Sequence, residues 1–488
     1  MVSNIGRENV DQEERAVNAK SPQPEDPADA RRPAKPGGAG QFRWVICALL
    51  FFATTINYMD RQVISYLKEF FCRPTEAGGF GWTNQDFSYL TSAFTGFYAG
   101  MTVLAGWFID KIGTKLGLAL SLVVWSISGI ANAFAGGLLE MHILVRSAFA
   151  IGEAGNFPAS IKTVAEWFPK RERALATAIF NAGSNAGAMV AALIVPAIMV
   201  HFGDRTGWRM AFILTGAAGF PWLFFWFWLY DPPFRHRKVS KLELDYIRVD
   251  DEPSAAPADD RGGLAWWKLF RYRQLWSFFA GKFMTDGVWW FYLFWLPDYL
   301  NKQFHMTRAQ VALPTFLVYG VAIVGSIYGG SIPKKLIEGG MSVYQARMTT
   351  MFILACLPLV VLLTQFFGDV RRFGGSAAVL AVAMISVGAT AHQAWSANLF
   401  STVSDMFPKP NIASVIGIGT MAGGIGGVLL QLLAGRLNDR FLGAPEAAYR
   451  IIFVVCGLSY LVAWALMKIL VPEHRTIPVS GPGRAARG

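Results

Sequence analysis

Two opposite charges interrupt the first apolar stretch of the chain. The stretch from Trp44 to Ile56 spans 13 residues, whereas a helix needs about 20 residues to cross the hydrocarbon core of a bilayer. The helix is therefore predicted to continue through Asp60 and Arg61 to about Leu67. A charge at the centre of such a helix costs about 2.5 to 3.5 kcal/mol unless it faces a cavity or a partner. This pair of charges is therefore a functional-site hypothesis.

Composition supports a membrane protein with several spans. The 488 residues are 53% hydrophobic and only 16% charged, whereas soluble domains are about 25% charged. The net charge of +11 raises the alternative of a nucleic-acid binder, but lysine and arginine collect in alternate loops, which indicates membrane topology. The sequence has no P-loop, zinc-protease or serine-elbow motif, so we expect neither an enzyme nor a cofactor or metal site, and no nucleic-acid partner.

The apolar runs predict an all-α membrane protein with twelve transmembrane helices in two pseudo-symmetric halves of six. Both halves contain a Phe-Pro-Lys sequence at an equivalent place, at Phe168 and at Phe407. Repeated halves with a site at their interface are typical of transporters. The basic loops predict that both termini are cytoplasmic. The predicted parts are a tail over 1–41, a bundle over 42–230, a linker over 231–272, a bundle over 273–472 and a tail over 473–488.

A short loop in the first half has the composition of a gate. Gly106 and Gly113 allow close helix approach and a tight turn. Asp110 lies beside Lys111 and Lys115, where charge-assisted hydrogen bonds can hold a gate closed. The alternative is a solvated turn that only follows the topology rule. The loop resembles the signature loop of the major facilitator superfamily, which implies a gating role.

Arg146 and Glu153 are seven residues apart, so two helical turns place them on one face. A structural ion pair with the first helix is one interpretation. In the other, a carboxylate beside Arg61 or Arg146 stays ionised until an anionic substrate binds the arginine, and then takes up a proton. Substrate and proton would then favour each other's binding, which is symport. We assign Arg146 itself to the gate.

Asn57 and Arg61 are four residues apart and share a helix face, while Asp60 points about 100° away. The planar guanidinium of arginine suits a carboxylate because it binds both oxygens at once. We therefore assign Arg61 to the substrate, against the alternative of a structural pairing.

The second half contributes aromatic rings beside amide and hydroxyl groups, a combination that suits a sugar. Most such aromatics pack or lie at the membrane interface, and only some line a cavity. Asn185 in the first half is a cavity residue or a helix-to-helix hydrogen bond, and His392 is a proton relay or a histidine bonded within the bundle. The further substrate-binding candidates are Trp290, Tyr292, Gln393, Trp395, Ser396 and Asn398.

Four runs together resemble the anion:cation symporter family, most closely bacterial hexuronate transporters: 57–61, 152–158, 392–400 and 421–427. The resemblance implies proton-driven uptake of sugar acids such as glucuronate and galacturonate across the inner membrane, by a monomer, with the proton as coupling ion. It implies that Tyr98 helps Arg61 to bind the substrate carboxylate, and that Asp60 and Glu153 take part in proton coupling. Galactonate, glucarate, phthalate and tartrate remain alternative substrates, and a membrane sensor or an efflux antiporter remains an alternative class.

Overall fold

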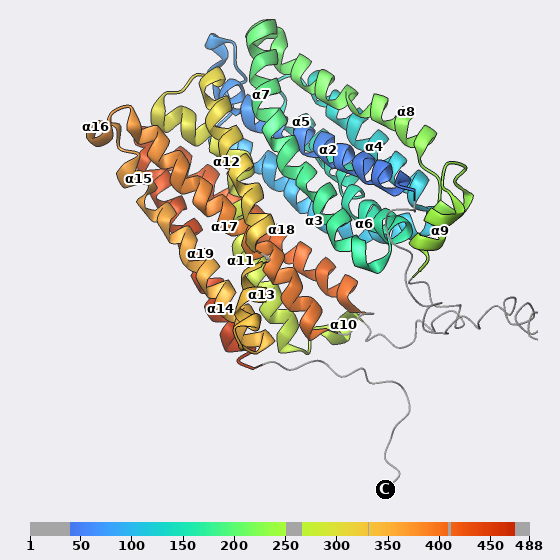
Figure 1. The fold of residues 1–488 in the computed structure, drawn as a ribbon. Helices are drawn as coiled ribbons and strands as arrows, with labels where there is room; N and C mark the ends of the chain where they lie inside the picture. The colour runs from blue at the N-terminus through green and yellow to red at the C-terminus, as the bar shows by residue number, and fades with distance from the viewer. Residues whose placement is uncertain (1–39, 250–265, 330, 408–410, 474–488) are drawn as a thin grey trace, which may run out of the picture.

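The computed structural model describes residues 40–249, 266–329, 331–407 and 411–473. Nearly all of the two predicted tails, and residues 250–265 of the predicted linker, lie outside these ranges. The described residues form helices and turns without any strand. The helices gather in two bundles that lie side by side, one from each half of the chain (Figure 1).

The N-terminal bundle contains seven α-helices and two short 3-10 turns that cap or join them. Their bounds are α2 (Phe42–Cys72), η2 (Thr75–Ala77), α3 (Asn84–Ile112), α4 (Thr114–Ala131), η3 (Asn132–Phe134), α5 (Leu139–Glu153), α6 (Asn156–Trp167), α7 (Lys170–Ala217) and α8 (Gly219–Leu229).

The C-terminal bundle follows the same plan, with short helices on the loops at its two ends. Its bounds are α11 (Arg273–Phe304), α12 (Arg308–Gly329), α13 (Ser331–Glu338), α14 (Val343–Cys356), η6 (Leu357–Leu363), α15 (Thr364–Phe367), α16 (Val370–Phe373), α17 (Ser376–Met406), α18 (Ile412–Arg440) and α19 (Pro445–Leu470).

Twelve membrane-crossing segments can be traced through the described residues. Nine helices there are long and apolar enough to cross a membrane. One of the nine, 175–229, is two segments joined at Gly203, whose φ of 69° lies in the left-handed region that favours glycine. The other two segments are the broken helix α5 and α6, and α11, which is rich in aromatic and charged residues. The predicted fold class is therefore confirmed.

The first helix is longer than predicted. It runs unbroken through Asp60 and Arg61, as expected, but ends at Cys72 rather than near Leu67. The extra turn contains Lys68, which is buried because Asp298 of the other half pairs with it. A charge that finds a partner across an interface does not end a helix, and the hydropathy pattern alone does not show that partner.

The first part of the predicted linker packs on the N-terminal half. It contains η4 (Pro233–Arg235) and α9 (Lys241–Ile247). Glu243 in α9 accepts a hydrogen bond from the backbone N–H of Arg43, and its carboxylate lies 3.4 Å from the Arg43 guanidinium. Tyr246 donates to Glu172 at 2.7 Å. The stretch before residue 250 is thus anchored to the start of α2 and of α7. A further short helix, α10 (Trp266–Leu269), precedes α11.

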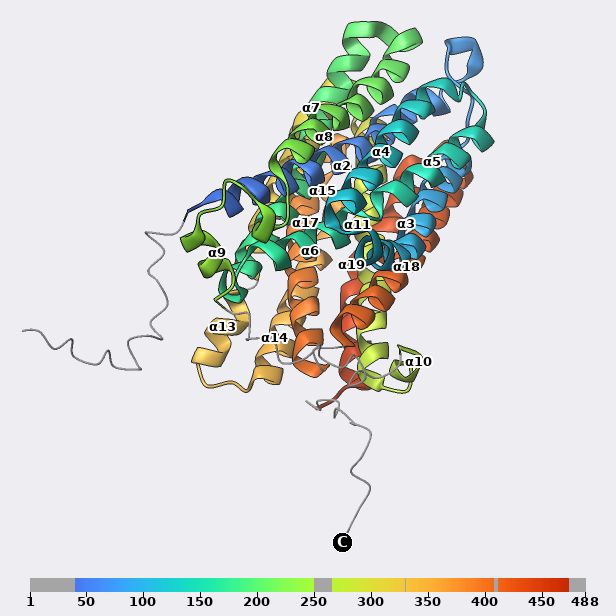
Figure 2. The ribbon, with the colours of Figure 1, turned by 90° about the vertical axis from the view of Figure 1, so that its right-hand side faces the viewer.

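Three helix pairs join the two bundles: α2 with α11, α3 with α18, and α7 with α12. Turned by 90°, α3 and α18 still lie next to each other (Figure 2). Their approach is close because Gly424 in α18 faces Ala99 in α3, where an added Cβ would lie only 2.2 Å from the alanine Cβ. The core between the bundles therefore places α2 and α11 at the centre of the molecule.

Candidate functional site

Arg61 lies at the centre of the molecule and is only 1% exposed. Its Nε lies 2.9 Å from Oε2 of Glu153, which is also buried. Its Nη2 donates to Oδ1 of Asn57 at 3.4 Å, across the one helical turn that separates the two residues. The predicted proximity of Arg61 and Glu153 is thus present as a buried ion pair between α2 and α5.

Four aromatic rings surround the Arg61 guanidinium. Its central carbon lies 4.2 Å from the ring centre of Tyr58, 4.6 Å from that of Tyr98, and 5.3 Å from those of Phe94 and Trp290. Such distances allow cation–π attraction, which strengthens where water is excluded. Three of these rings come from the N-terminal half and Trp290 from the C-terminal half, so both halves contact the same cation.

Asp60 points away from this cage, as the helix geometry predicted. It is 3% exposed, and neither of its oxygens has a hydrogen-bond donor within the described ranges. Thr215, Glu153 and Arg146 are its polar neighbours. Burial of an unpaired carboxylate charge costs free energy unless a proton or a cation neutralises it. Asp60 is therefore a buried carboxyl group whose charge is not neutralised by a direct ion pair within the described ranges.

Arg146 lies beside Arg61 and is remote from the 106–115 loop. Its Nη2 donates to the backbone carbonyl oxygen of Arg61 at 2.7 Å. Arg146 and Glu153 are on the same helix, α5, which ends directly after Glu153. At that break Gly155 packs so closely on α4 that an added Cβ would lie 2.0 Å from Oγ of Ser121. The close packing holds the end of α5 against α4, and the Glu153 carboxylate at that end reaches Arg61 of α2.

The other predicted substrate residues are distributed more widely. Tyr292 and Trp395 are 1% and 0% exposed and face the interior of the C-terminal bundle, next to Gly388 and Tyr460 respectively. Asn398 donates to the carbonyl oxygen of Gly329 and so joins α17 to α12. The hydrogen bonds and ring contacts of these three residues within the described ranges are with residues outside the Arg61 cage. Gln393 and Ser396 on α17 are partly exposed, and Asn185 on α7 is buried.

The ion pairs of the 106–115 loop are with residues of the N-terminal half and of the segment that directly follows it. Asp110 pairs with Lys162 of α6 at 2.7 Å, rather than with the neighbouring loop lysines, and Lys115 pairs with Asp231 at 2.7 Å. Lys111 lies over the ring of Trp107. Gly106 faces α6, where an added Cβ would lie 4.0 Å from Pro158.

The turn after α3 and the end of α8 are tied together at the same end of the bundle. Gly113 has a φ of 86°, which favours glycine. Glu166 accepts hydrogen bonds from Thr114 at 2.8 Å and from Tyr230 at 2.7 Å. Burial, together with the Glu166 charge, raises the pKa of Tyr230, so this tyrosine remains a hydrogen-bond donor at physiological pH. The loop is therefore bonded to α6 and to the residues that directly follow α8.

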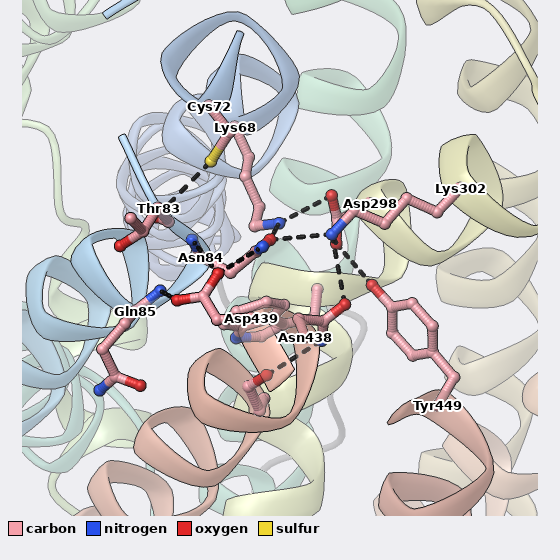
Figure 3. A network of polar contacts seen from close by, with 12 residues as sticks. Lys68, Cys72, Thr83, Asn84, Gln85, Asp298, Lys302, Asn438, Asp439 and Tyr449 are labelled. Carbon is pink, nitrogen blue, oxygen red and sulfur yellow. Dashed lines mark hydrogen bonds and ion pairs between the residues drawn. The ribbon is translucent and has the colours of Figure 1, made fainter. Parts of the chain in front are cut away.

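A polar network that the hydropathy pattern did not indicate closes the opposite end of the interface (Figure 3). Asp298 of α11 accepts from Lys68 of α2 at 2.7 Å, from Lys302 at 3.1 Å and from Tyr449 at 2.5 Å. The side-chain oxygen of Asn84 accepts from both lysines, at 2.7 and 2.8 Å. The two halves thus share one connected set of charge-assisted bonds, which we call the core network.

Asp439 extends the core network to the start of α3. Its carboxylate accepts from the backbone N–H groups of Asn84 and Gln85 at 2.9 and 2.8 Å. An anion at a helix N-terminus satisfies free donors and interacts favourably with the helix dipole. The C-terminal half therefore caps a helix of the N-terminal half.

Four charged residues near the core network are more exposed than its members. We call these four residues the rim. Arg308 of the C-terminal half pairs with Glu69 and Asp204, and Arg73 pairs with the same two acids. The side chains of the rim are 16 to 42% exposed, whereas those of Lys68 and Asp298 are 1% and 4% exposed. The core network is thus buried from solvent, whereas the rim is partly exposed to it.

Some of these residues carried a signal in the sequence. Tyr58 lies inside the 57–61 run, and Phe94 precedes Tyr98 by one helical turn on the same face. Lys68 is seven residues after Arg61 and so continues its face towards the end of the helix. Asp298 precedes Lys302 by four residues, a spacing that allows an ion pair on one helix, but its partner Lys68 is in the other half. Asp439 gave no comparable signal, because its partners Asn84 and Gln85 are in the other half.

Comparison with known proteins agrees with the motifs. The hexuronate transporter of Escherichia coli K12 is 28% identical over 428 residues, which cover 87% of this chain and 94% of that protein. The D-galactonate transporter of Escherichia coli O6:H1 is 28% identical over 435 residues, covering 88% and 96%. These relatives are transporters and not enzymes. The resemblance to hexuronate transporters is thereby confirmed.

The fold comparison points the same way. A crystal structure of a bacterial homolog of the human lysosomal transporter Spinster, in an inward-facing and unoccupied conformation, superposes with a TM-score of 0.68 at 19% identity, covering 89% of this chain and 98% of that one. The sequence model of the Major Facilitator Superfamily matches residues 50–430. Twelve crossing segments in two bundles, a gate-like loop after the second segment and this match together show that the chain is a multi-pass membrane protein that belongs to the Major Facilitator Superfamily.

Proposed function

We propose that the protein is a proton-coupled symporter that takes up sugar-acid anions, hexuronates such as glucuronate and galacturonate first among them. The observation that carries the proposal is the buried pair of Arg61 and Glu153 inside a cage of aromatic rings from both halves. The hexuronate and galactonate relatives support the substrate class. Other organic acids, namely galactonate, glucarate, phthalate and tartrate, are the alternative substrates.

Arg61 is the group that binds the substrate carboxylate. Its Nε is held by Glu153 and one Nη by Asn57, so a carboxylate that arrives has to replace Glu153 on the guanidinium. A planar guanidinium offers two parallel donors to such a carboxylate. The rings of Tyr58, Tyr98 and Trp290 then suit the apolar face of a sugar.

Glu153 couples substrate to proton. Once it loses Arg61, its carboxylate remains buried without an opposite charge, and a buried unpaired charge is strongly destabilising. Taking up a proton removes that charge. Substrate binding therefore favours proton binding at Glu153, and thermodynamic linkage makes the reverse equally true. Asp60, buried one residue from Arg61, is the second proton acceptor.

The conformation is consistent with alternating access. The core network and the rim close the end of the interface that lies away from the 106–115 loop. With both termini on the cytoplasmic side, as the basic loops predict, the closed end would be the outer one, and we propose that the conformation is the inward-facing state of the transport cycle. A single chain contains the whole Arg61 site, so a monomer suffices for transport.

Two other classes fit less well. An efflux antiporter for cations would place its ligand beside the Arg61 guanidinium, which repels cations. A membrane sensor on the same scaffold would only have to bind its ligand. It would not need Glu153 to release Arg61 and take up a proton.

The test is uptake into proteoliposomes that contain the purified protein. Labelled glucuronate should accumulate when an inward proton gradient is imposed, and a protonophore should abolish the accumulation. Glu153→Gln should lose this gradient-driven uptake and retain exchange of labelled for unlabelled substrate, because a permanently neutral group mimics the protonated state. Uptake that ignores the protonophore would refute proton coupling. Equal loss of uptake and exchange would show that Glu153 serves folding or binding instead.

A further inference from the structure

A cavity of about 590 Å³ lies at the end of the N-terminal bundle, outside the Arg61 site. It is lined by the start of α4, the end of α6, residues 230–235 after α8, and the end of α9. The 18 residues of α4 span about 27 Å, close to the roughly 30 Å of the hydrocarbon core. The first turn of α4, and the cavity beside it, therefore lie at the level of the lipid headgroups.

The carboxylates at the cavity neutralise only part of its positive charge. Asp231 pairs with Lys115 and Asp110 pairs with Lys162, each at 2.7 Å. Glu166 accepts hydrogen bonds from two hydroxyl groups rather than from a cation. Five cations thus face three carboxylates, which leaves a net charge of +2. The cationic residues that line the cavity are Lys115, Lys162, Arg173, Arg235 and Arg248.

The three arginines at the cavity have no carboxylate partner in the part of the chain that the structure describes. Arg173 donates from Nε to the carbonyl oxygen of Phe168 and from Nη2 to that of Ala165, both at 2.9 Å. Carbonyl oxygens fix the orientation of the guanidinium but do not neutralise its charge. Arg235 and Arg248 are exposed. The cavity therefore offers three guanidinium groups to an anion.

Apolar side chains lead away from the cavity along α4 and α8. Leu116 and Phe234 line the cavity and are 53% and 57% exposed. Exposed apolar residues follow Leu116 at helical spacing, so they form one face of α4. Because α4 and α8 cross the membrane, such exposed apolar faces contact lipid chains. The exposed residues are Leu120, Val124 and Ile127 on α4, and Phe224, Phe227 and Trp228 on the neighbouring α8.

Membrane topology alone does not account for this arrangement. The positive-inside rule requires lysine and arginine in a loop, but it requires neither a cavity nor a guanidinium that backbone carbonyls hold in place. A guanidinium matches a phosphate group because it can donate two parallel hydrogen bonds to its oxygens. The arginines and the apolar faces beside them thus suit one ligand that has both a phosphate and apolar chains.

We propose that this cavity binds the headgroup of an anionic phospholipid, with the phosphate among Arg173, Arg235 and Arg248 and the acyl chains along α4 and α8. The inference goes beyond the proposed function, since it requires neither substrate nor proton. Lys115 belongs to the 106–115 loop and Arg248 follows α9 directly. A single lipid headgroup therefore joins the gate-like loop to the segment that connects the two halves.

The test measures lipid binding to the purified full-length protein in detergent. Dioleoyl phosphatidylglycerol and dioleoyl phosphatidylcholine have the same chains and differ in headgroup charge, and native mass spectrometry counts the molecules of each that stay bound. The wild type should bind phosphatidylglycerol more tightly, and this lipid should raise the thermal unfolding midpoint further. Arg235→Gln with Arg248→Gln should raise the Kd for phosphatidylglycerol by about tenfold or more, because two cations at the headgroup are lost.

The matched control is Arg237→Gln with Lys241→Gln. Both residues are exposed and lie on the same segment as Arg235 and Arg248, but they do not line the cavity. The control removes the same charge and should leave the Kd unchanged. An equal rise of the Kd in both double variants would show that the lipid responds to total charge and would overturn the proposal. Without added lipid, both variants should unfold at the wild-type midpoint, because all four side chains are exposed.

Soluble phosphates show whether the acyl chains matter. Glycerol 3-phosphate and inorganic phosphate present the headgroup chemistry without chains, and they should not displace phosphatidylglycerol at the concentration at which the lipid saturates the site. Displacement at that concentration would show that the cavity takes a soluble phosphate and would overturn the lipid assignment. Equal binding of the two lipids by the wild type would refute the site. Since no arm of the test uses glucuronate, its failure and the failure of the proposed function are independent.

Discussion

The Arg61 guanidinium contacts a carboxylate, an amide and four aromatic rings. Lysine at the same place would keep the charge but not the flat fork of donors, because its ammonium group is a compact point charge. The shape of the group, and not its charge alone, therefore decides how well a carboxylate replaces Glu153.

Arg61→Lys should raise the KM for glucuronate by about tenfold or more, since one of two parallel charge-assisted hydrogen bonds is lost. The measurement is the concentration dependence of uptake at a fixed proton gradient. Arg372→Lys, an exposed arginine on the outer loop, is the matched control. A KM close to that of the wild type would remove Arg61 from the substrate site.

The residues on α2 were the most predictable part of the site. A charge pair in a stretch too short to span the membrane predicted that Arg61 faces a partner, and helix geometry separated Asp60 from it. The aromatic residues of α11 and α17 were less predictable. A run of aromatic residues gives no signal for which face meets the cavity. Tyr292 and Trp395 pack inside the C-terminal bundle, and their role in substrate binding stays a prediction.

At the scale of elements, the contact between α2 and α7 sets the position of the cage. Gly183 and Gly187 on α7 touch the α2 backbone, where added Cβ atoms would lie 2.5 Å from the carbonyl oxygen of Phe51 and 2.3 Å from that of Thr55. The second glycine also faces Tyr58, one of the four rings. Small residues at such spacing allow membrane helices to approach closely.

Gly187→Ala should destabilise the protein by about 1 to 3 kcal/mol, because the methyl group has to displace backbone atoms in a packed interface. Gly100→Ala is the control, since an added Cβ there meets nothing within 4 Å. It should leave stability unchanged or raise it by up to about 1 kcal/mol through helix propensity. Thermal unfolding in detergent measures both. Equal shifts for the two variants would show that the contact between α2 and α7 is not tight in solution.

The boundaries of elements were harder to predict than their existence. The fourth segment was predicted as one helix but is divided into α5 and α6, because Gly152 and Gly155 press against α4. Glycines in an apolar run occur both in continuous helices and at helix breaks. Which of the two forms depends on the neighbouring helix, and a single sequence does not show which helix that is.

At the scale of the whole molecule, the buried core network joins the two halves. Every bond of the core network that crosses between α2 or α3 and the C-terminal half has to break before the outer side opens. Removing the charges of Lys68 and Asp298 together should therefore favour the open form; Lys302, which is 27% exposed, then keeps only its hydrogen bonds to Asn84 and Asn438.

Lys68→Gln combined with Asp298→Asn should shift the equilibrium towards the outward-open form by about 1.5 kcal/mol or more, roughly tenfold in population. Spin labels at Glu76→Cys and Leu442→Cys, two exposed positions at the outer ends of the halves, report the opening as a longer distance in a background without the native cysteines. The control is Lys334→Gln with Glu338→Gln, an exposed pair within α13. An unchanged distance distribution would show that the core network does not hold the outer side closed.

The division of this closure into a core and a rim makes it respond unevenly to ionic strength. Screening acts over about 10 Å at 0.1 M salt and about 3 Å at 1 M, and it weakens exposed ion pairs far more than buried ones. Glu69, Asp204 and Arg308 are partly exposed to solvent, whereas Lys68 and Asp298 are buried. Salt on the side of the membrane that the rim faces should therefore weaken the rim first and leave the core network intact, so we expect the opening rate to depend on ionic strength on that side only.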